Sequence, residues 1–343
     1  MSPSHLKQPR PRDGSIARRS PDYIAMSIVQ QLTDRNLIRP PRFLPKNIHY
    51  ETLMGSVAYG VSSDTSDSDI YGFCIPEKDM VFPHLRGEIP GFGSQTPRFE
   101  QWQEHHVLDK QALGGKGRTY DFSIYSIVKY FQLCMENNPN MIDSLFTPQS
   151  CVLHITAVGA IARENRRLFL HKGAWHKFKG YAYSQLHKMN SKQPPEGKRR
   201  DLVEAYGYDV KFAYHVVRLL DEVEQILTEG DIDLQRNREQ LKSIRRGEWT
   251  QQDIVDHFSR KERDLESLYT ACKLPHSPPE DRIKQMLMEC LEHHYGSIAD
   301  CIVPADAAGA TLAEIQSSLD RYFAASGNPL RGAVSQDGGD ILS

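Results

Sequence analysis

Apolar and polar residues alternate at strand spacing in the first part of the chain. Residues 48–54 and 69–75 each have the pattern of a short strand, and Pro76 ends the second one. Residues 120–124 predict a third strand. Ahead of these, residues 22–38 place apolar side chains at near-helical spacing and stop before two prolines, which predicts a first helix.

Helical spacing dominates the later part of the chain. Ser126 is a suitable cap for a helix that begins at Ile127, and beyond Asn138 the strand signals mostly vanish. Helical patterns follow at residues 154–171, 173–190, 201–228, 250–272 and 279–294, with a last amphipathic helix at 311–324. By contrast, residues 77–118 are rich in glycine and proline and predict an irregular excursion.

The change of pattern predicts two domains between two tails. A length of 343 residues agrees with this, since one domain usually takes roughly 100 to 200 residues. We expect a flexible basic tail, a sheet-containing domain, a helical domain, and a C-terminal helix with a flexible tail, at residues 1–20, 21–150, 151–295 and 296–343.

Composition narrows the class of protein. The chain is 39% hydrophobic and 25% charged, with no apolar run near the ~20 residues that span a bilayer, so neither a membrane protein nor a wholly disordered one is expected. The basic N-terminus lacks the apolar stretch of a secretory signal. Six cysteines lie far apart without paired spacing, which argues against a zinc or disulfide framework and favours a reducing, cytoplasmic setting.

Positive charge is concentrated in one segment. Residues 163–200 hold eleven Lys or Arg against two Glu, a local charge of +9 in a chain whose net charge is −2. Trp175, Phe178, Tyr181 and Tyr183 are interleaved with these cations, a combination that suits phosphate attraction and base stacking, as an RNA acceptor would need. The alternative is a solvated helix face whose aromatic side chains point into a core.

Two aspartates in the second strand segment are the strongest candidates for chemistry. Asp67 and Asp69 would project to the same face of a strand, where two like charges are unfavourable unless a cation lies between them. Hard carboxylate oxygens suit Mg²⁺ or Mn²⁺. Phosphoryl transfer with two metals would need a third carboxylate, and Asp121 begins the third predicted strand. A simple surface turn is the competing interpretation.

A glycine step lies upstream of this pair. Gly55 and Ser56 could leave backbone N–H groups and a hydroxyl free to hold phosphate oxygens, with residues 62–68 as the turn that leads back to the acidic strand.

Together these residues resemble a known signature. The segment GSVAYGVSSDTSDSDIYGFCIP, residues 55–76, is similar to the polymerase-β-type nucleotidyltransferases, and within them to the predicted nucleotidyltransferases found alongside RNA ligases in RNA repair clusters. The similarity covers about residues 46–290 and continues through YSIVKYFQLCMENNPNMIDSLF, KFKGYAYSQLHKM, KFAYHVVRLLDEVEQILTEGDIDL and LKSIRRGEW. It implies an α+β fold: a small mixed sheet backed by helices, followed by an α-helical domain, with nucleotide bound between them.

The resemblance also implies roles for the candidate residues. Gly55 and Ser56 would hold the nucleoside triphosphate, Asp67 and Asp69 would bind metal, and Asp121 would be the third acid and general base. Asp109 is a rival for the third position, but its surroundings do not have the pattern of a strand.

Helical spacing adds further candidates for the nucleotide. Lys177 and Tyr181 lie one turn apart, as do Lys211 and His215, with Arg218 three residues further on, and we expect the first four of these residues to face the nucleotide. A solvated helix face is the alternative for both stripes. A metal site at His105 and His106 is not expected, because adjacent residues point apart in regular structure.

These observations predict a metal-dependent nucleotidyltransferase that moves a nucleoside monophosphate from ATP or another NTP to an acceptor hydroxyl, such as an RNA end, and releases pyrophosphate. Transfer to a protein or a small molecule remains open, and so does a non-catalytic nucleic-acid-binding partner protein.

Overall fold

The computed structural model describes residues 26–62, 67–190, 198–297 and 307–326. The expected N-terminal tail, the tail beyond residue 326, and most of the polar loop between the second and third helical patterns lie outside these residues. By its contacts the chain divides into two compact units, one of residues 1–76 and 99–290, the other of residues 77–98 and 291–343. The domain boundaries expected from the sequence stay a prediction.

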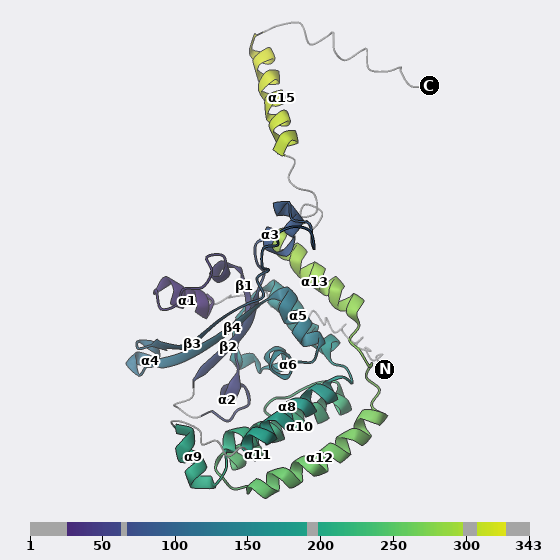
Figure 1. Cartoon of the computed structure of the whole chain (residues 1–343). Helices are drawn as coiled ribbons and strands as arrows, with labels where there is room; N and C mark the ends of the chain where they lie inside the picture. Colours follow the sequence, from purple (N-terminus) through teal and green to yellow (C-terminus); the bar gives the residue numbers. More distant parts are fainter. Residues whose placement is uncertain (1–25, 63–66, 191–197, 298–306, 327–343) are drawn as a thin grey trace, which may run out of the picture. The chain divides into compact units, whose positions relative to one another are not determined.

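The first unit contains a mixed sheet of five strands in the order β3-β4-β2-β1-β5. The strands are β1 (Ile48–Leu53), β2 (Ser68–Cys74), β3 (Gln101–Asp109), β4 (Arg118–Ser126) and β5 (Val152–Ile155). β2 and β4 run parallel, and every other pair is antiparallel. This mixed sheet, together with the many helices in Figure 1, confirms the predicted α+β class.

Each face of the sheet has its own core, because alternate residues of a strand point to opposite sides. On one face, Ile70 and Phe122 are fully buried against α1 (Ile28–Asp34) and the short helix η1 (Leu44–Asn47). On the other face, the Phe73 ring lies 5.0 Å from that of Tyr130 on α5 (Ile127–Met135). Asp69 lies on the same face as Phe73, near the start of β2, and is less buried than Phe73.

Polar side chains cap the helices that come after β4 and β5. As predicted, the Ser126 hydroxyl caps α5 by accepting from the Lys129 N–H. Asn138 caps α6 (Pro139–Phe146), whose first residue is the proline often found there. Thr156 caps α7 (Ala157–Glu164), and η4 (Arg166–Phe169) comes next.

The helical part is built around one buried helix. α10 (Val210–Glu229) packs against α8 (Ala174–Met189), α11 (Arg238–Arg245) and α12 (Gln251–Ala271), which Figure 1 shows beside it. Asp209 caps the start of α10, and Gly230 ends it in the left-handed conformation. A hydrophobic stripe of this helix, including Val216 and Leu220, is fully buried.

Several segments differ from the sequence-based expectation. The stretch expected to be irregular contains the nine-residue strand β3, whose alternation is obscured because most of its side chains are exposed. The short strand β5 was missed, and it lies beyond the expected boundary at residue 150. The helix predicted at 201–228 is two helices, α9 (Lys198–Tyr206) and α10, because Gly207 has a positive φ of 78°. The first helix begins only at Ile28, after its cap Ser27.

The second unit consists mainly of short or isolated helices. These are α3 (Lys78–Val81), η2 (Pro83–Arg86), the end of α13 (Glu280–Tyr295), which begins in the first unit, and α15 (Ala307–Ser326). The Lys78 ammonium lies 5.8 Å from the centre of the Tyr295 ring. Within the residues described, helices of a length and hydropathy that could cross a membrane are absent.

Candidate active site

Two of the predicted acids lie opposite each other on neighbouring strands. β2 and β4 pair in parallel with Asp69 in register with Asp121, so the two side chains project from the same face of the sheet. Asp67 lies one residue before β2 and is exposed. It is two residues from Asp69, the spacing of side chains on one face of a strand. The sheet therefore brings the predicted third acid beside the predicted pair, although 51 residues (70–120) lie between Asp69 and Asp121 in the chain.

The glycine step lies against the same carboxylate. Gly55 begins the one-turn helix α2 (Gly55–Ala58) with φ +64°, and a Cβ at this position would stand 2.2 Å from Asp69 Oδ2. The Met54 N–H donates to the Asp69 carbonyl at 2.8 Å, which joins the start of α2 to β2. Only glycine fits here without displacing the carboxylate, and Ser56 follows at the start of the same turn.

The electrostatics of Asp69 reveal which charges surround it. Burial raises its pKa, and the negative charges of Asp121 and Asp67 raise it further, while Lys211 and His105 oppose the rise. A carboxyl that is half-buried beside two other carboxyls is a site where a cation would be stabilised.

Two histidines lie beside the third acid, contrary to the sequence-based argument. β3 has a bulge between Glu104 and Val107, and His106 has a positive φ of 58°. The His106 N–H donates to Asp121 Oδ1 at 2.7 Å, and Nδ1 of His105 lies 3.7 Å from the same oxygen. The premise that adjacent residues point apart fails at a bulge, and no simple sequence signal identifies this one.

Asp109, the rival third acid, has a different environment. It ends β3, is buried, and receives two hydrogen bonds from the Arg35 guanidinium, at 2.6 and 2.7 Å. The hydrogen bond from Arg35 lowers the pKa of Asp109, with burial opposing it. This carboxylate is thus committed to an ion pair with the segment after α1.

The polar stripe of α10 separates into two parts. Lys211, in its first turn, is close enough to Asp69 to lower the pKa of that carboxyl. His215 packs beside Tyr214, with ring centres 4.2 Å apart. Arg218 is buried and paired with Asp143 and Glu222, so the stripe expected at this residue is an internal ion-pair network.

The predicted pair on α8 has nearby polar partners. Lys177 Nζ lies 3.3 Å from Glu136 Oε2, with both side chains about half exposed. The Tyr181 hydroxyl accepts a hydrogen bond from Asn138 Nδ2 at 3.1 Å. Burial raises the pKa of Tyr125 on β4, and Tyr181 raises it further. Tyr125 shares the face of Asp121, so Tyr181 lies near that face, whereas Lys177 is bound to α5's C-terminal cap residue.

Some of the charge in the basic segment is neutralised by acidic partners from elsewhere in the chain. Arg167 pairs with Asp231 and Lys179 with Glu262, while Arg163 donates to the Tyr50 hydroxyl. Trp175 and Phe178 are buried in the core, and Tyr183 remains 62% exposed. The interpretation of a helix face with aromatics in a core therefore describes Trp175 and Phe178.

The three predicted acids do not by themselves form a closed metal centre. In the described part of the chain, no three His, Cys, Asp or Glu side chains are arranged closely enough to hold a metal ion. The donor chemistry nevertheless fits a hard divalent cation, because carboxylate oxygens are the ligands such ions prefer and Asp69 and Asp121 stand in register on neighbouring strands.

The chain is similar to one known family in sequence. Residues 29–289 match RlaP, described as the RNA repair pathway DNA polymerase beta family. Among curated proteins, none matches at a significant level. Of the solved structures, the chain is similar to the "nucleotidyltransferase-like protein from Exiguobacterium sibiricum 255-15", with 11% identity, coverage of 77% of this chain and 73% of that chain, and a TM-score of 0.25.

The fold and the family together define the class of protein as a nucleotidyltransferase of the polymerase β type. Within that class, the chain belongs to the RNA repair pathway DNA polymerase beta family, as the match covers well over half of its length. The predicted resemblance is confirmed.

Proposed function

We propose that the protein transfers a nucleoside monophosphate from an NTP to an acceptor hydroxyl and releases pyrophosphate, with an RNA end as the acceptor. The observation that carries this proposal is the register of β2 and β4, which sets Asp69 beside Asp121 while Gly55 lies against the Asp69 carboxylate. A phosphate-binding turn next to paired carboxylates is the arrangement that phosphoryl transfer needs.

We assign each residue a role on the basis of its position. The Ser56 hydroxyl and the backbone N–H groups of α2 would hold phosphate oxygens, since a glycine step allows close approach. Lys211 would offset phosphate charge, because it already lies near Asp69. Asp121 would accept the proton of the attacking hydroxyl. Tyr181 and His215 would line the nucleotide side of the same face, and Lys177 would contribute only after leaving Glu136.

Asp67, Asp69 and Asp121 are the residues that would hold Mg²⁺ or Mn²⁺. When bound, such ions supply charge stabilisation for the triphosphate and lower the pKa of the attacking hydroxyl.

A transfer assay tests the proposal. Purified protein is incubated with Mg²⁺ or Mn²⁺, each α-³²P-labelled NTP in turn, and RNA with a free or a blocked 3′ hydroxyl. We expect label on the RNA with the free end and none with Asp69→Asn or Asp121→Asn. Label on protein, or on a small molecule supplied instead of RNA, would show that this molecule and not RNA is the acceptor. Wild type that transfers nothing to any acceptor, with either metal, would overturn the enzymatic proposal in favour of a binding protein.

A further inference from the structure

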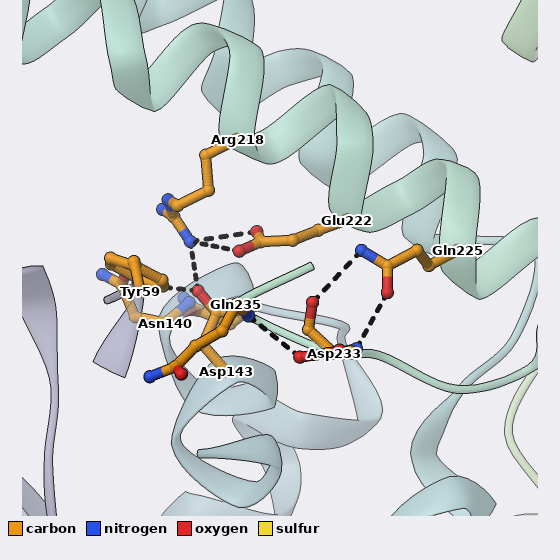
Figure 2. A network of polar contacts seen from close by, with 9 residues as sticks. Tyr59, Asn140, Asp143, Arg218, Glu222, Gln225, Asp233 and Gln235 are labelled. Atoms are coloured by element: carbon orange, nitrogen blue, oxygen red, sulfur yellow. Dashed lines mark hydrogen bonds and ion pairs between the residues drawn. The ribbon is translucent and has the colours of Figure 1, made fainter. Parts of the chain in front are cut away.

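A buried ionic network connects the end of α2 to the helical part of the first unit. The Tyr59 hydroxyl, directly after α2, donates to Asp143 Oδ2 on α6 at 2.9 Å. Arg218 of α10 donates to the same oxygen of Asp143 and to both carboxylate oxygens of Glu222 at 2.9 Å. Its guanidinium also lies over the Tyr59 ring, 4.2 Å from the ring centre. Figure 2 shows these four side chains converging.

Burying this network costs desolvation free energy, because its charged groups are removed from water. Asp143 is 0%, Glu222 2% and Arg218 4% exposed. Burial raises the pKa of both carboxyls, and the positive charge of Arg218 opposes this rise. An apolar cluster of similar volume would often stabilise a fold as well or better, so a network of this kind is better explained by what it positions than by stability alone.

A second set of contacts holds the same short segment. Gln235 Nε2 donates to the Ala58 carbonyl at 3.1 Å, and Arg245 donates to the Val61 carbonyl. The loop that carries Gln235 is itself fixed to α10, because the Asp233 N–H donates to Gln225 Oε1 at 2.8 Å (Figure 2).

α2 depends on such support. It is a single turn of four residues, with positive φ at Gly55 and again at Gly60. One isolated turn is unstable by itself, because several dihedral angles are fixed for few hydrogen bonds. A shift of α2 by even a fraction of an ångström changes the distance between Gly55 and the Asp69 carboxylate, where there is no spare room.

We infer that Tyr59, Asp143, Arg218 and Glu222, together with Gln235, form a positioning network that holds the α2 turn in its phosphate-binding geometry and thereby sets the affinity for the triphosphate. This inference rests on the proposed function. α10 contributes twice, since Lys211 near its start is close enough to Asp69 to lower the pKa of that carboxyl and Arg218, two turns later, lies over the Tyr59 ring.

Tyr59→Phe tests the network by removing one hydroxyl. Tyr130→Phe is the matched control, because Tyr130 is also fully buried and its hydroxyl bonds to Ser144, the residue after Asp143, without reaching α2. Calorimetry with Mg²⁺ and a nonhydrolysable analogue of each NTP is combined with steady-state kinetics. We expect Tyr59→Phe to weaken binding and raise KM by about three- to tenfold, with kcat changed less than twofold, and Tyr130→Phe to change neither.

Gln235→Leu provides an independent variant if Tyr59→Phe folds poorly. It keeps the side-chain volume, removes the donor to Ala58 and alters a residue outside the buried ion pairs, so we expect the same rise in KM with little loss of thermal stability.

Amide hydrogen exchange separates this inference from the proposed function. Protection of residues 55–61 should fall in Tyr59→Phe and Gln235→Leu and stay unchanged in Tyr130→Phe, whether or not a nucleotide binds. Unchanged exchange there, or a KM equal to that of wild type, would overturn the positioning network. Wild type that binds no NTP while the exchange result holds would instead overturn the proposed function.

Discussion

Gly55 and Asp69 approach so closely that any side chain at residue 55 would overlap the Asp69 carboxylate. A Cβ at residue 55 would lie 2.2 Å from Oδ2 of Asp69, and the backbone there has φ +64°. This contact joins the candidate phosphate-binding turn to the candidate metal-binding strand, and it leads to the first prediction.

Gly55→Ala should impair both stability and nucleotide binding. Gly207→Ala is the control, since its φ is +78° but a Cβ there would meet nothing within 4 Å. We expect the control to lose about 1 kcal/mol of unfolding free energy through backbone strain alone. Gly55→Ala should lose clearly more in urea denaturation and should weaken NTP binding at least tenfold. Equal losses in the two variants would show that the close contact is unimportant.

The two carboxylates in register should limit stability in the absence of a cation. Asp69→Asn removes a charge that is half-buried beside Asp121 and Asp67. We expect the variant to gain up to about 1 kcal/mol in unfolding free energy without metal while it loses transfer activity. Thermal unfolding with and without Mg²⁺ measures this, and a destabilised Asp69→Asn would contradict it.

Asp121 and Asp109 should behave differently when each is replaced by Asn. Asp109→Asn breaks the ion pair with Arg35, so we expect lower thermal stability with transfer activity retained. Asp121→Asn should abolish transfer without lowering stability, because it removes the repulsion with Asp69. The assignment of the third acid would have to be reversed if Asp109→Asn were inactive and Asp121→Asn active, each at a temperature where it is folded.

Two lysines predicted to face the nucleotide should also differ. Lys211 lies near Asp69, whereas Lys177 is paired with Glu136 on the surface. We expect Lys211→Met to raise KM for the NTP by about tenfold, the equivalent of about 1.4 kcal/mol, and Lys177→Met to change it less than twofold. Steady-state kinetics at constant ionic strength provides the comparison, and similar effects of the two changes would argue for a general charge effect.

Two buried groups should make opposite contributions to the pH dependence of stability. Burial, aided by Lys261 and Arg260 and opposed by Glu224, lowers the pKa of His257 to about 4. The contribution of His257 to the unfolding free energy is therefore full above its ordinary pKa of 6.5 and is lost as pH falls toward 4. Burial raises the pKa of Glu51 to about 7, although the hydrogen bonds from the Ile28 and Val29 N–H groups oppose the rise. The contribution of Glu51 to the unfolding free energy is therefore full below its ordinary pKa of 4.5 and is lost as pH rises toward 7.

Each contribution amounts to about 3 kcal/mol, and the two nearly cancel between pH 4.5 and 6.5. We expect His257→Gln to make the unfolding free energy fall as pH rises through this range, and Glu51→Gln to make it rise. Urea denaturation from pH 4 to 7.5 measures the slopes, with exposed His187→Gln as the control. Slopes of the same sign in both variants would contradict the assignment.

Local patterns were sufficient for most of the fold and for the identity of the acids. Strand alternation, the Ser126 cap and the helical stripes are properties of neighbouring residues, so they predicted β1, β2, β4, α5 and most of the helices. The Gly-Ser step and the acidic pair, with the longer similarity around them, were sufficient to predict the family.

The tertiary structure decided what depends on partners distant in the chain. Asp121 lies beside Asp69 because β2 and β4 pair in parallel, whereas Asp109 is held by Arg35 on another segment. A bulge brings His105 and His106 to Asp121, and burial makes Arg218, which the helical spacing placed on a polar stripe with Lys211 and His215, the centre of an internal network. Register, bulges and burial are properties of pairs of segments that meet only when the chain has folded, so the sequence by itself determined the candidate groups, and the packing determined which of them lie together.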